Sequence, residues 1–519
     1  MNKKPATRLR DLGVFGLSGF AAAAVLFSVA QLMSAFFATA SAPLVAMGAV
    51  FIDLTPPWLK DFAIATFGTN DKLALFISIG VVVSIASVLI GILARRHFAL
   101  AAPIILLLAV VIGAAVLSRP ATGLVDLTPV ILGTVASLGT LKWLTKLASR
   151  TRAPGQEQSE KPGSSRRNFL LGATLALVGS AVATGVGRSL ATVRNVADSA
   201  RSALGLPVAK VLADPPPAGA QIELSGMPKF VTPNKDFYRI DTALSVPRIN
   251  PSEWSLRVHG MVEKEFTISF DELLAEDLLE TYLTLTCVSN PVGGQLVGNA
   301  KWLGYPLRKL LERAVPQAEA DMVLSTSEDG FSASTPIEVL MDDRMALLAV
   351  GMNGEPLPLE HGFPVRMVVP GLYGYVSATK WVVDLEVTRF EDKMGYWTTR
   401  GWSDHGPIKL SSRVDVPRSF ASVPAGKVTL GGTAWAQTKG ISKVQVQIDD
   451  EDWKDAELAT EASLDTWRQW RYDWEGGSSG NHTVTVRAVD REGNVQTSDK
   501  ADPVPNGASG WQRVQFSVE

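Results

Sequence analysis

The sequence predicts a chain of several domains: an N-terminal α-helical transmembrane bundle, a central α+β domain and a C-terminal immunoglobulin-like β-sandwich. Three observations predict this fold class. The chain has 519 residues, which is too long for one ordinary domain. Hydrophobic residues make up 46% of the chain, which is high for a soluble protein, and the excess is concentrated in the first 190 positions. From about residue 426 onward, short stretches alternate hydrophobic and polar residues with the period of a β-strand.

The N-terminal region contains four apolar stretches that are each long enough to span a bilayer as one helix. They lie at about 12–36, 73–94, 99–118 and 128–148. A further apolar stretch at about 42–52 would be either a second span or an interfacial or re-entrant segment. We favour the second reading, because Ser41 and Pro43 interrupt the stretch and a sixth crossing would oppose the charge pattern.

The basic residues of the N-terminal region predict how it is oriented. They precede the first span and follow the second and the fourth, and the cytoplasmic side of a membrane protein carries the excess of such residues. We therefore expect a multi-pass protein of the cell membrane with a cytoplasmic N-terminus. The residues that carry this prediction are Lys3, Lys4, Arg8, Arg10, Arg95, Arg96, Lys142, Lys146, Arg150, Arg152 and Lys161.

A twin arginine, Arg166-Arg167, precedes an uncharged run that ends at Gly187. The pattern Ser-Arg-Arg-Asn-Phe-Leu resembles a twin-arginine translocation signal, and the alternative is the basic flank of a fifth span. The twin-arginine route carries folded proteins, typically ones that already hold a cofactor, so it places the following domain on the outer, periplasmic face. Residues 181–183 resemble a cleavage site, but the apolar run is short and we expect a retained anchor.

Composition shifts predict the domain boundaries, and proline-rich or polar stretches mark the connections. The expected parts are a four-span region at 1–150, a polar linker with the twin-arginine motif and the fifth span at 151–190, a linker at 191–229, the α+β domain at 230–400, a connector at 401–425 and the sandwich at 426–519.

Cys287 is the only cysteine of the chain and follows a predicted strand with one buried face. A single thiol excludes an internal disulfide and a protein-ligated iron–sulfur cluster. The predicted spans contain no histidine, so they cannot hold a haem between paired imidazoles. Two interpretations stay open: a buried, inert thiol, or one ligand to a metal that a cofactor carries. Gly293-Gly294 and Gly298-Asn299 predict an open loop after it.

A series of motifs then appears in one order along residues 230–519. Together they resemble the sulfite oxidase family of molybdopterin-dependent oxidoreductases, in its membrane-anchored bacterial type with a C-terminal dimerisation domain. The motifs are Phe237-Tyr-Arg239, Thr286-Cys287-x-x-Asn290, Asp329-Gly330, Met352-Asn-Gly354, His361-Gly-Phe-Pro-Val-Arg366, Val369-Pro-Gly371, Lys380-Trp381, Gly432-Thr-Ala-Trp435, Thr466-Trp-Arg468 and Val486-Arg-Ala-Val-Asp490.

The resemblance implies a sulfite-oxidase-type α+β domain that binds molybdenum and molybdopterin. Cys287 would be the catalytic residue and the metal ligand, since its soft sulfur suits a metal already bound by the dithiolene sulfurs of the pterin. The family reaction is a two-electron oxygen-atom transfer on a small-molecule substrate. By the same resemblance, the cofactor would be held by Phe237, Tyr238, Arg239, Asp241, Asn290, Asp329, His361, Arg366, Ser377 and Lys380.

The sequence departs from the sulfite-oxidising members at the positions that bind the substrate anion. Val288-Ser-Asn-Pro-Val follows the cysteine, Val350-Gly351 precedes the Met-Asn-Gly turn, and Asn506-Gly-Ala-Ser-Gly510 stands near the C-terminus. Three anion-binding groups of those members are therefore absent. A less charged substrate, such as a sulfoxide, is the resulting hypothesis.

The expected partners follow from the same features. No haem domain precedes the α+β domain, so electrons would pass to a separate carrier. The apolar helices imply membrane lipid, the dimerisation-type domain implies a homodimer, and a net charge of −2 favours no nucleic acid. Two other hypotheses stay open: a non-catalytic membrane-anchored binding or scaffold protein that reuses the fold, and a transporter or sensor, which the few intramembrane charges disfavour.

Overall fold

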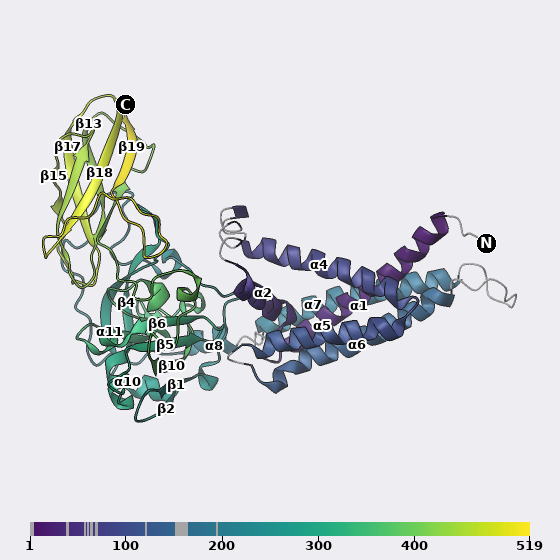
Figure 1. Cartoon of the computed structure of the whole chain (residues 1–519). Helices are drawn as coiled ribbons and strands as arrows, with labels where there is room; N and C mark the ends of the chain where they lie inside the picture. The colour runs from purple at the N-terminus through teal and green to yellow at the C-terminus, as the bar shows by residue number, and fades with distance from the viewer. Residues whose placement is uncertain are drawn as a thin grey trace. The chain divides into compact units, whose positions relative to one another are not determined.

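The computed structural model describes residues 5–37, 41–56, 59, 62, 66–67, 71–119, 122–150, 164–193 and 196–519. The chain forms two compact units (Figure 1). The first is helical and comprises residues 1–195 with Ala243–Pro247, and the second comprises residues 196–242 and 248–519. Of the segment expected to hold the polar linker, the twin-arginine motif and the fifth span (151–190), residues 151–163 lie outside the described residues.

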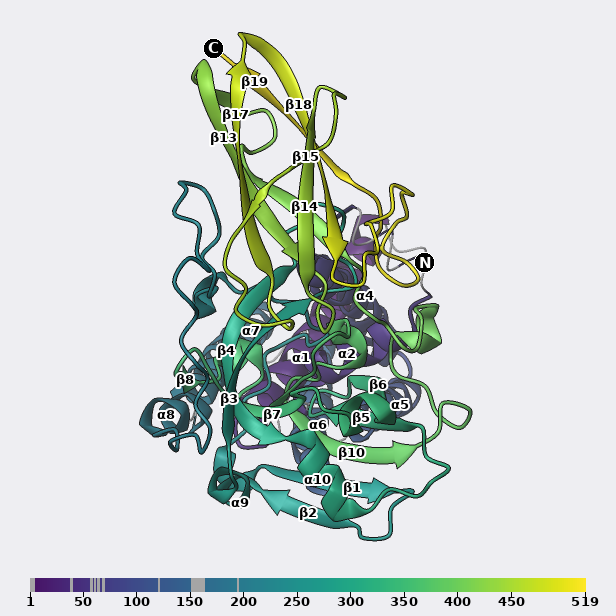
Figure 2. The ribbon, with the colours of Figure 1, turned by 90° about the vertical axis from the view of Figure 1, so that its left-hand side faces the viewer.

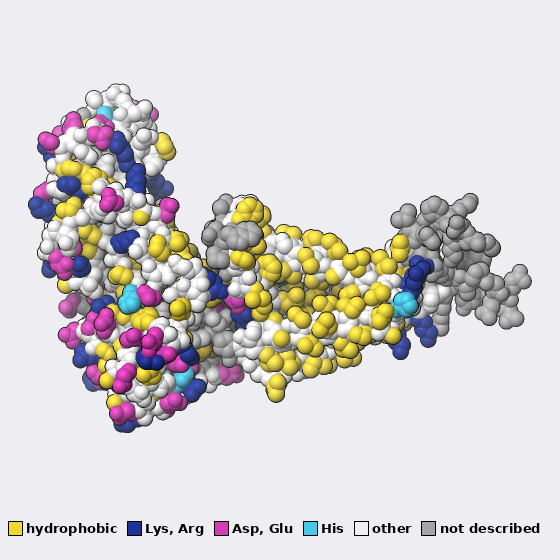
Figure 3. Space-filling model, in the orientation of Figure 1, with side chains coloured by type: hydrophobic (Ala, Val, Ile, Leu, Met, Phe, Trp, Pro, Cys, Tyr) yellow, Lys and Arg dark blue, Asp and Glu magenta, His cyan; other side chains and the backbone are white. Residues whose placement is uncertain are grey.

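Five helices of the first unit, as far as it is described, are long and apolar enough to cross a membrane. They correspond to the five predicted spans. Figure 3 shows hydrophobic side chains over the outward faces of this unit that are in view, whereas the second unit carries many charged ones. The helices are α1 (Pro5–Ser34), the short α2 (Pro43–Leu54), α4 (Asp71–Ala94), α5 (Phe98–Leu117), α6 (Thr128–Arg150) and α7 (Ser164–Val193).

Helix α1 lies in the middle of the helical unit and packs against α4, α6 and α7. Small residues permit this packing: a Cβ atom on Gly19 would lie only 1.9 Å from the carbonyl oxygen of Ser87 in α4. Helix association in membranes depends on such close approach, because lipid supplies no hydrophobic driving force between helices.

The second unit contains an α+β part built on two sheets. The first sheet has the order β2-β1-β10-β5-β6, and the second has the order β3-β4-β7-β8, with β9 paired to β7. The strands are β1 (Ser255–Gly260), β2 (Phe266–Ser269), β3 (Leu279–Thr286), β4 (Val297–Pro306), β5 (Met322–Ser327), β6 (Ser332–Pro336), β7 (Leu347–Met352), β8 (Glu355–Pro356), β9 (Arg366–Val368) and β10 (Val382–Thr388).

Short helices cover these sheets, and their ends follow from local sequence. Ser269 is the N-terminal cap of helix α9 (Phe270–Ala275), and its hydroxyl accepts from the Glu272 N–H in a capping box. All the apolar residues of α10 (Leu307–Ala314) face the core, as their spacing predicts. The remaining helices are α8 (Val196–Ala203), α11 (Ile337–Met341) and 3₁₀ turns at Leu124–Leu127, Asn234–Asp236, Pro251–Glu253, Leu359–His361, Gly374–Val376 and Thr398–Arg400.

Two further sheets form the C-terminal part and share one hydrophobic core (Figure 2). The first contains β11 (Ser411–Val416), β13 (Gly426–Trp435), β17 (Arg468–Gly477) and β16 (Glu457–Leu458). The second contains β12 (Ser422–Val423), β19 (Gln512–Val518), β18 (Gly480–Asp490), β14 (Ile441–Ile448) and β15 (Lys454–Asp455).

The stretch expected as a connector at 401–425 contains β11, which pairs with β13 in the first of these sheets. Sequence periodicity does not reveal this strand, because Arg413 and Asp415 occupy it and both side chains are largely buried as an ion pair.

Strand β3 differs from the prediction in that both of its faces are buried. Its Thr284 and Thr286 are 1% and 2% exposed. The free edge of β3 is covered by the C-terminal part: the Thr284 N–H donates to the Asp465 carbonyl at 3.0 Å, and the Gln437 amide donates to the Thr284 carbonyl at 3.0 Å. Thr284 therefore lies in a polar interface with the C-terminal part and not on a solvent-facing surface.

The glycines after Cys287 also differ from the expectation of one open loop. Gly298 and Asn299 lie inside β4, paired with Leu285 and Thr284 of β3. The ring of Phe237 lies against Gly298, where a Cβ atom would be 2.8 Å from the ring. This glycine is a close-approach site and not a turn residue.

We predict that Thr284→Val lowers the free energy of unfolding by about 2 kcal/mol, because it removes two buried hydrogen bonds and leaves their partners unsatisfied. The Thr284 hydroxyl donates to Asn299 Oδ1 at 3.1 Å and accepts from the Trp467 N–H at 2.8 Å. Thermal unfolding in detergent measures the change. Thr281→Val, whose hydroxyl has only a 3.5 Å contact in the same strand, is the matched control, and equal effects of the two would contradict the assignment.

Candidate functional site

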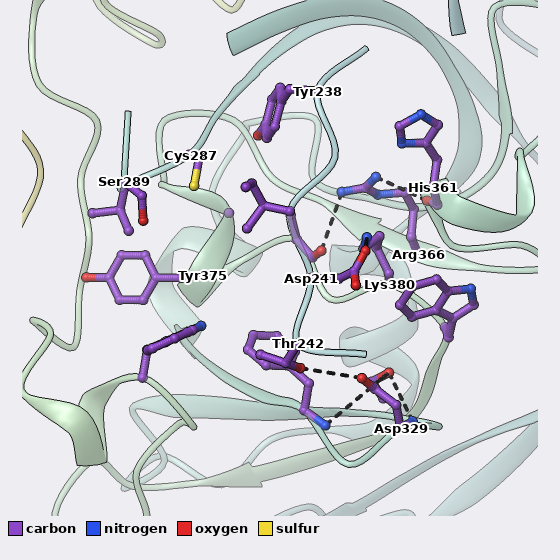
Figure 4. A pocket seen from close by; sticks show the side chains of 18 of the residues that line it. Tyr238, Asp241, Thr242, Cys287, Ser289, Asp329, His361, Arg366, Tyr375 and Lys380 are labelled. Carbon is purple, nitrogen blue, oxygen red and sulfur yellow. Dashed lines mark hydrogen bonds and ion pairs between the residues drawn. The ribbon is translucent and has the colours of Figure 1, made fainter. Parts of the chain in front are cut away.

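One pocket of the second unit collects most of the residues that the sequence singled out. It encloses about 910 Å³ of empty space, part of which is open to solvent. In Figure 4, Cys287, Ser289 and Tyr375 lie on one side of the pocket, and His361, Arg366 and Lys380 lie on the other. The lining residues are Phe237, Tyr238, Ile240, Asp241, Thr242, Cys287, Val288, Ser289, Ser327, Asp329, Phe331, His361, Arg366, Gly374, Tyr375, Ala378, Lys380, Trp381, Trp397 and Trp402.

Cys287 occupies the first position after β3, where the chain leaves the sheet. Its N–H donates to the Leu296 carbonyl at 2.9 Å, which closes the loop that leads to β4. Burial raises the pKa of the thiol, and hydrogen bonds from the backbone and side chain of Ser289 act in the opposite direction. Burial is the larger effect, so the pKa of the thiol is raised overall, while the Ser289 donors favour the thiolate form.

Arg366, at the start of β9, is a buried guanidinium without a carboxylate partner among the described residues. Its hydrogen bonds go to the carbonyls of His361, Met367 and Ala378, at 3.1, 3.3 and 3.4 Å. Burial lowers the pKa of Arg366 to about 10, so the group stays protonated at neutral pH. An anion in the pocket would stabilise this charge.

Lys380 adds a second cation, which is paired with Asp241 across 2.8 Å. Burial lowers the pKa of Lys380 to about 8, although Asp241 opposes the shift. Burial alone would raise the pKa of Asp241, but Lys380 and Arg239 hold it at about 2. The pair is therefore ionised near neutral pH, and the Lys380 charge is held at the pocket wall.

His361 is an uncharged imidazole in this site at neutral pH. Burial, followed by the charges of Arg366 and Lys380, lowers the pKa of His361 to about 4. Its Nε2 lies 3.2 Å from the carbonyl oxygen of Asn234, and its ring meets that of Phe237 edge to face at 5.7 Å. The residue can exchange hydrogen bonds without adding charge.

Asp329 lies at another part of the wall, near Thr242 (Figure 4). Burial raises the pKa of its carboxyl, and the Ser327 hydroxyl, which donates across 2.5 Å, opposes the shift. The Thr242 hydroxyl donates to its second oxygen at 3.4 Å. The carboxyl is thus an oriented acceptor at the pocket surface.

The structure does not bring every predicted site residue into the pocket. Arg239 is half-exposed and binds Asp241 from outside, at 2.9 Å. Asn290 uses its side-chain oxygen to accept from the Leu296 N–H at 2.9 Å, so it shapes the cysteine loop. The Ser377 hydroxyl donates to the Tyr373 carbonyl at 3.0 Å. These three residues support the walls and do not line the cavity.

Sequence reasoning missed several residues that line the pocket, among them Thr242, Ser327, Tyr375, Trp397 and Trp402. Trp397 and Trp402 fall in a stretch with no regular pattern, and only the fold carries them to the mouth of the cavity. The ring of Tyr375 lies 5.8 Å from that of Trp402 at an interplanar angle of 51°, and the Tyr375 hydroxyl donates to the Ser403 carbonyl at 2.6 Å. The sequence signal that could have identified Trp397 and Trp402 was the cluster of aromatic residues in this irregular region.

The residues of the pocket fit a metal that arrives with its own ligands and an anionic group. No cluster of three or more histidine, cysteine or acidic residues suited to a metal occurs in the described part of the chain. One thiolate cannot by itself complete a metal site. Buried cations across the pocket provide for an anion, and this donor set matches a pterin cofactor with a dithiolene-bound metal and a phosphate.

We predict that the stability of the cofactor-free, full-length protein falls by about 3 kcal/mol between pH 6.5 and pH 4 through His361 alone. The pKa of the histidine is depressed from 6.5 to about 4 in the fold, so the unfolded chain binds the proton first and the stability is lost as the pH falls. Thermal unfolding against pH should show a shallower decline in His361→Gln, and an unchanged slope would refute the role of His361.

The comparisons with known proteins identify the family. The "Oxidoreductase molybdopterin binding domain" family matches residues 243–397. Sulfite oxidase of Gallus gallus is 30% identical over 325 residues, covering 54% of this chain and 70% of that protein. The uncharacterized oxidoreductase YuiH of Bacillus subtilis is 33% identical over 155 residues, which cover 30% of this chain and 75% of that protein.

A further relative is the protein-methionine-sulfoxide reductase catalytic subunit MsrP of Ralstonia nicotianae, 31% identical over 229 residues, covering 40% of this chain and 66% of that protein. The chain spans 62% to 64% of the length of the mitochondrial sulfite oxidases of mouse, rat and human. The matched domain and the relatives imply a molybdenum–molybdopterin cofactor. This chain belongs to the sulfite oxidase family of molybdopterin-dependent oxidoreductases.

Proposed function

We propose that the protein is a membrane-anchored molybdenum-cofactor oxidoreductase that carries out two-electron oxygen-atom transfer on a small, weakly charged oxo compound. The observation that carries this proposal is the arrangement of the pocket. The chain's only thiol lies on one side, and a buried guanidinium and ammonium lie on the other (Figure 4). A thiolate facing a metal and cations facing a phosphate are what the cofactor requires.

Each protein group has a definite part in this proposal. The Cys287 sulfur would bind the metal, and the hydrogen bonds from Ser289 would lower its electron donation. Arg366 and Lys380 would hold the phosphate, and His361 would bind the cofactor without adding charge. When bound, the cofactor would supply oxygen-atom exchange with water, while the protein positions it and tunes its electronics.

The side of the pocket near Cys287 supports a substrate of low charge. Ser289, Tyr375 and Trp402 are uncharged, and the Tyr375 hydroxyl already donates to the Ser403 carbonyl. The lysine and arginine that line the pocket, Lys380 and Arg366, lie on the opposite side. A sulfoxide fits such a surface better than a sulfite dianion, because burying an anion without a cation costs several kcal/mol.

The N-terminal helices support a location in the cell membrane, with five crossings. Arg95 and Arg96 follow α4 and Lys142 and Lys146 lie at the end of α6, so the positive-inside rule places these ends and the start of α7 in the cytoplasm. The twin arginine at that start favours export of a folded domain to the outer face. A separate electron carrier and a homodimer through an immunoglobulin-like C-terminal sandwich complete the proposal.

We predict that the purified protein contains molybdenum and molybdopterin, and that Arg366→Met loses about nine-tenths of both. The buried guanidinium would contribute a charge-assisted hydrogen bond to the phosphate, worth about 1.5–3 kcal/mol. Elemental analysis and fluorescence of the oxidised pterin give the contents. Arg239→Met is the matched control and should stay loaded, because Arg239 lies outside the lining. If the wild-type protein contained neither molybdenum nor molybdopterin, the enzyme proposal would be wrong and the binding or scaffold alternative would replace it.

We predict further that a reduced viologen dye drives turnover of dimethyl sulfoxide or methionine sulfoxide, with kcat/KM about 10- to 100-fold above that for sulfite oxidation, since a missing charge contact costs about 1.5–3 kcal/mol. Cys287→Ser should retain pterin and lose activity by on the order of 100-fold. Sulfite turning over faster than the sulfoxides would overturn the substrate, and full activity in Cys287→Ser would overturn the ligand.

A further inference from the structure

The loop from Cys287 to Leu296, here called the cysteine loop, is closed tightly on itself. The Asn290 N–H donates to the Cys287 carbonyl at 3.1 Å, and the Gly294 N–H donates to the Pro291 carbonyl at 2.8 Å. A Cβ atom on Gly294 would lie 2.4 Å from the Asn290 side-chain oxygen. A loop with so little internal freedom transmits a displacement at Gly294 to the cysteine at its start.

Arg413 binds this loop from the C-terminal part of the second unit. Its Nη1 donates to the Gly294 carbonyl oxygen at 2.8 Å. Its Nε lies 2.8 Å from Asp415 Oδ1, and the second oxygen of Asp415 accepts from the Thr433 hydroxyl at 3.1 Å. A chain of polar contacts therefore leads from strand β13 through β11 to the cysteine loop.

The side chain of Gln512 holds the neighbouring position of the loop. Gly293 has a φ of +76°, and a Cβ atom there would lie 2.4 Å from the Gln512 amide. The Gln512 oxygen accepts from the Val414 N–H at 2.7 Å, beside the irregularity in the pairing of β11 with β13. Arg413 of β11 and Gln512 of β19 thus lie against two consecutive residues of the loop, and Gln512 is itself bonded to β11.

We propose that Arg413 is a positioning residue that sets the place of the Cys287 sulfur through Gly294. The C-terminal sandwich then contributes to the geometry of the site as well as to any dimer contact. Burying a guanidinium costs free energy unless its N–H groups form hydrogen bonds. Arg413 uses its Nη1 for a bond to the Gly294 carbonyl of the loop and not for a bond within the sheet. The inference rests on the proposed role of Cys287 as the metal ligand.

The test uses the fact that Cys287 is the only thiol in the chain. Alkylation of the full-length, cofactor-free protein by iodoacetamide, followed by mass spectrometry, reports on this loop alone. We expect Arg413→Met to raise the rate by about tenfold, because losing a hydrogen bond from a charged donor makes local opening of the loop easier by at least that factor. Arg413→Met with Asp415→Asn should behave in the same way and leaves no unpaired buried carboxylate.

Arg468→Met is the matched control. Arg468 also donates to two carbonyls, those of Ala459 and Ile441, at 2.8 Å each, but it makes no bond to the cysteine loop. Its alkylation rate should stay within about twofold of the wild type at a similar thermal stability. A general loosening of the sandwich would raise the rate in both variants and would overturn a specific role for Arg413.

In the loaded enzyme, Arg413→Met should shift the g values of the molybdenum electron paramagnetic resonance signal, and Arg468→Met should not. Unchanged g values together with an unchanged alkylation rate would overturn the proposal. If the wild-type protein contained no molybdenum, the proposed function would be wrong instead. The alkylation rates would still decide whether Arg413 holds the loop.

Discussion

Buried positive charge in one wall of a pocket is the constraint on which the site depends. Arg366 is 5% exposed and makes its hydrogen bonds to carbonyl oxygens, which satisfy its donors without neutralising its charge. Lys380 is 8% exposed and has one carboxylate partner in Asp241, which Arg239 shares. Such a wall is stable only where an anion can approach it. Burial and the same charges lower the pKa of His361, so the proposed anion would meet two cations and an uncharged imidazole.

The thiol of Cys287 depends on a second arrangement, the enclosure of β3. An edge strand normally presents free backbone groups. Here the C-terminal part covers that edge through Gln437 and Asp465, and it also binds the loop that follows the strand through Arg413. The cysteine therefore stands where the α+β part and the C-terminal part of the second unit meet, and both parts hold the loop that carries it.

Some parts of the fold and site could be predicted because their signals are local. The five long helices follow from apolar runs of the right length, and α9 and α10 follow from a capping box and helical spacing. Other parts could not be predicted, since their residues are buried by partners far away in the sequence. Strand β11 contains charged residues that only Thr433 and the cysteine loop make acceptable in the interior. Asn290 and Ser377 look like ligands in a motif, yet their side chains bind backbone groups.

The sequence by itself determined the chemistry that is available: one thiol, a spaced histidine and arginine, five apolar helices and the family motifs. It also indicated which charges of the sulfite-oxidising members are absent, because a missing side chain is visible without a fold. The tertiary structure decided which groups meet. It placed Tyr375, Trp397 and Trp402 in the pocket that contains Cys287, kept Arg239 outside the pocket and brought Arg413 to the cysteine loop. These groups come from segments far apart in the sequence, and their positions depend on packing, which no local pattern encodes.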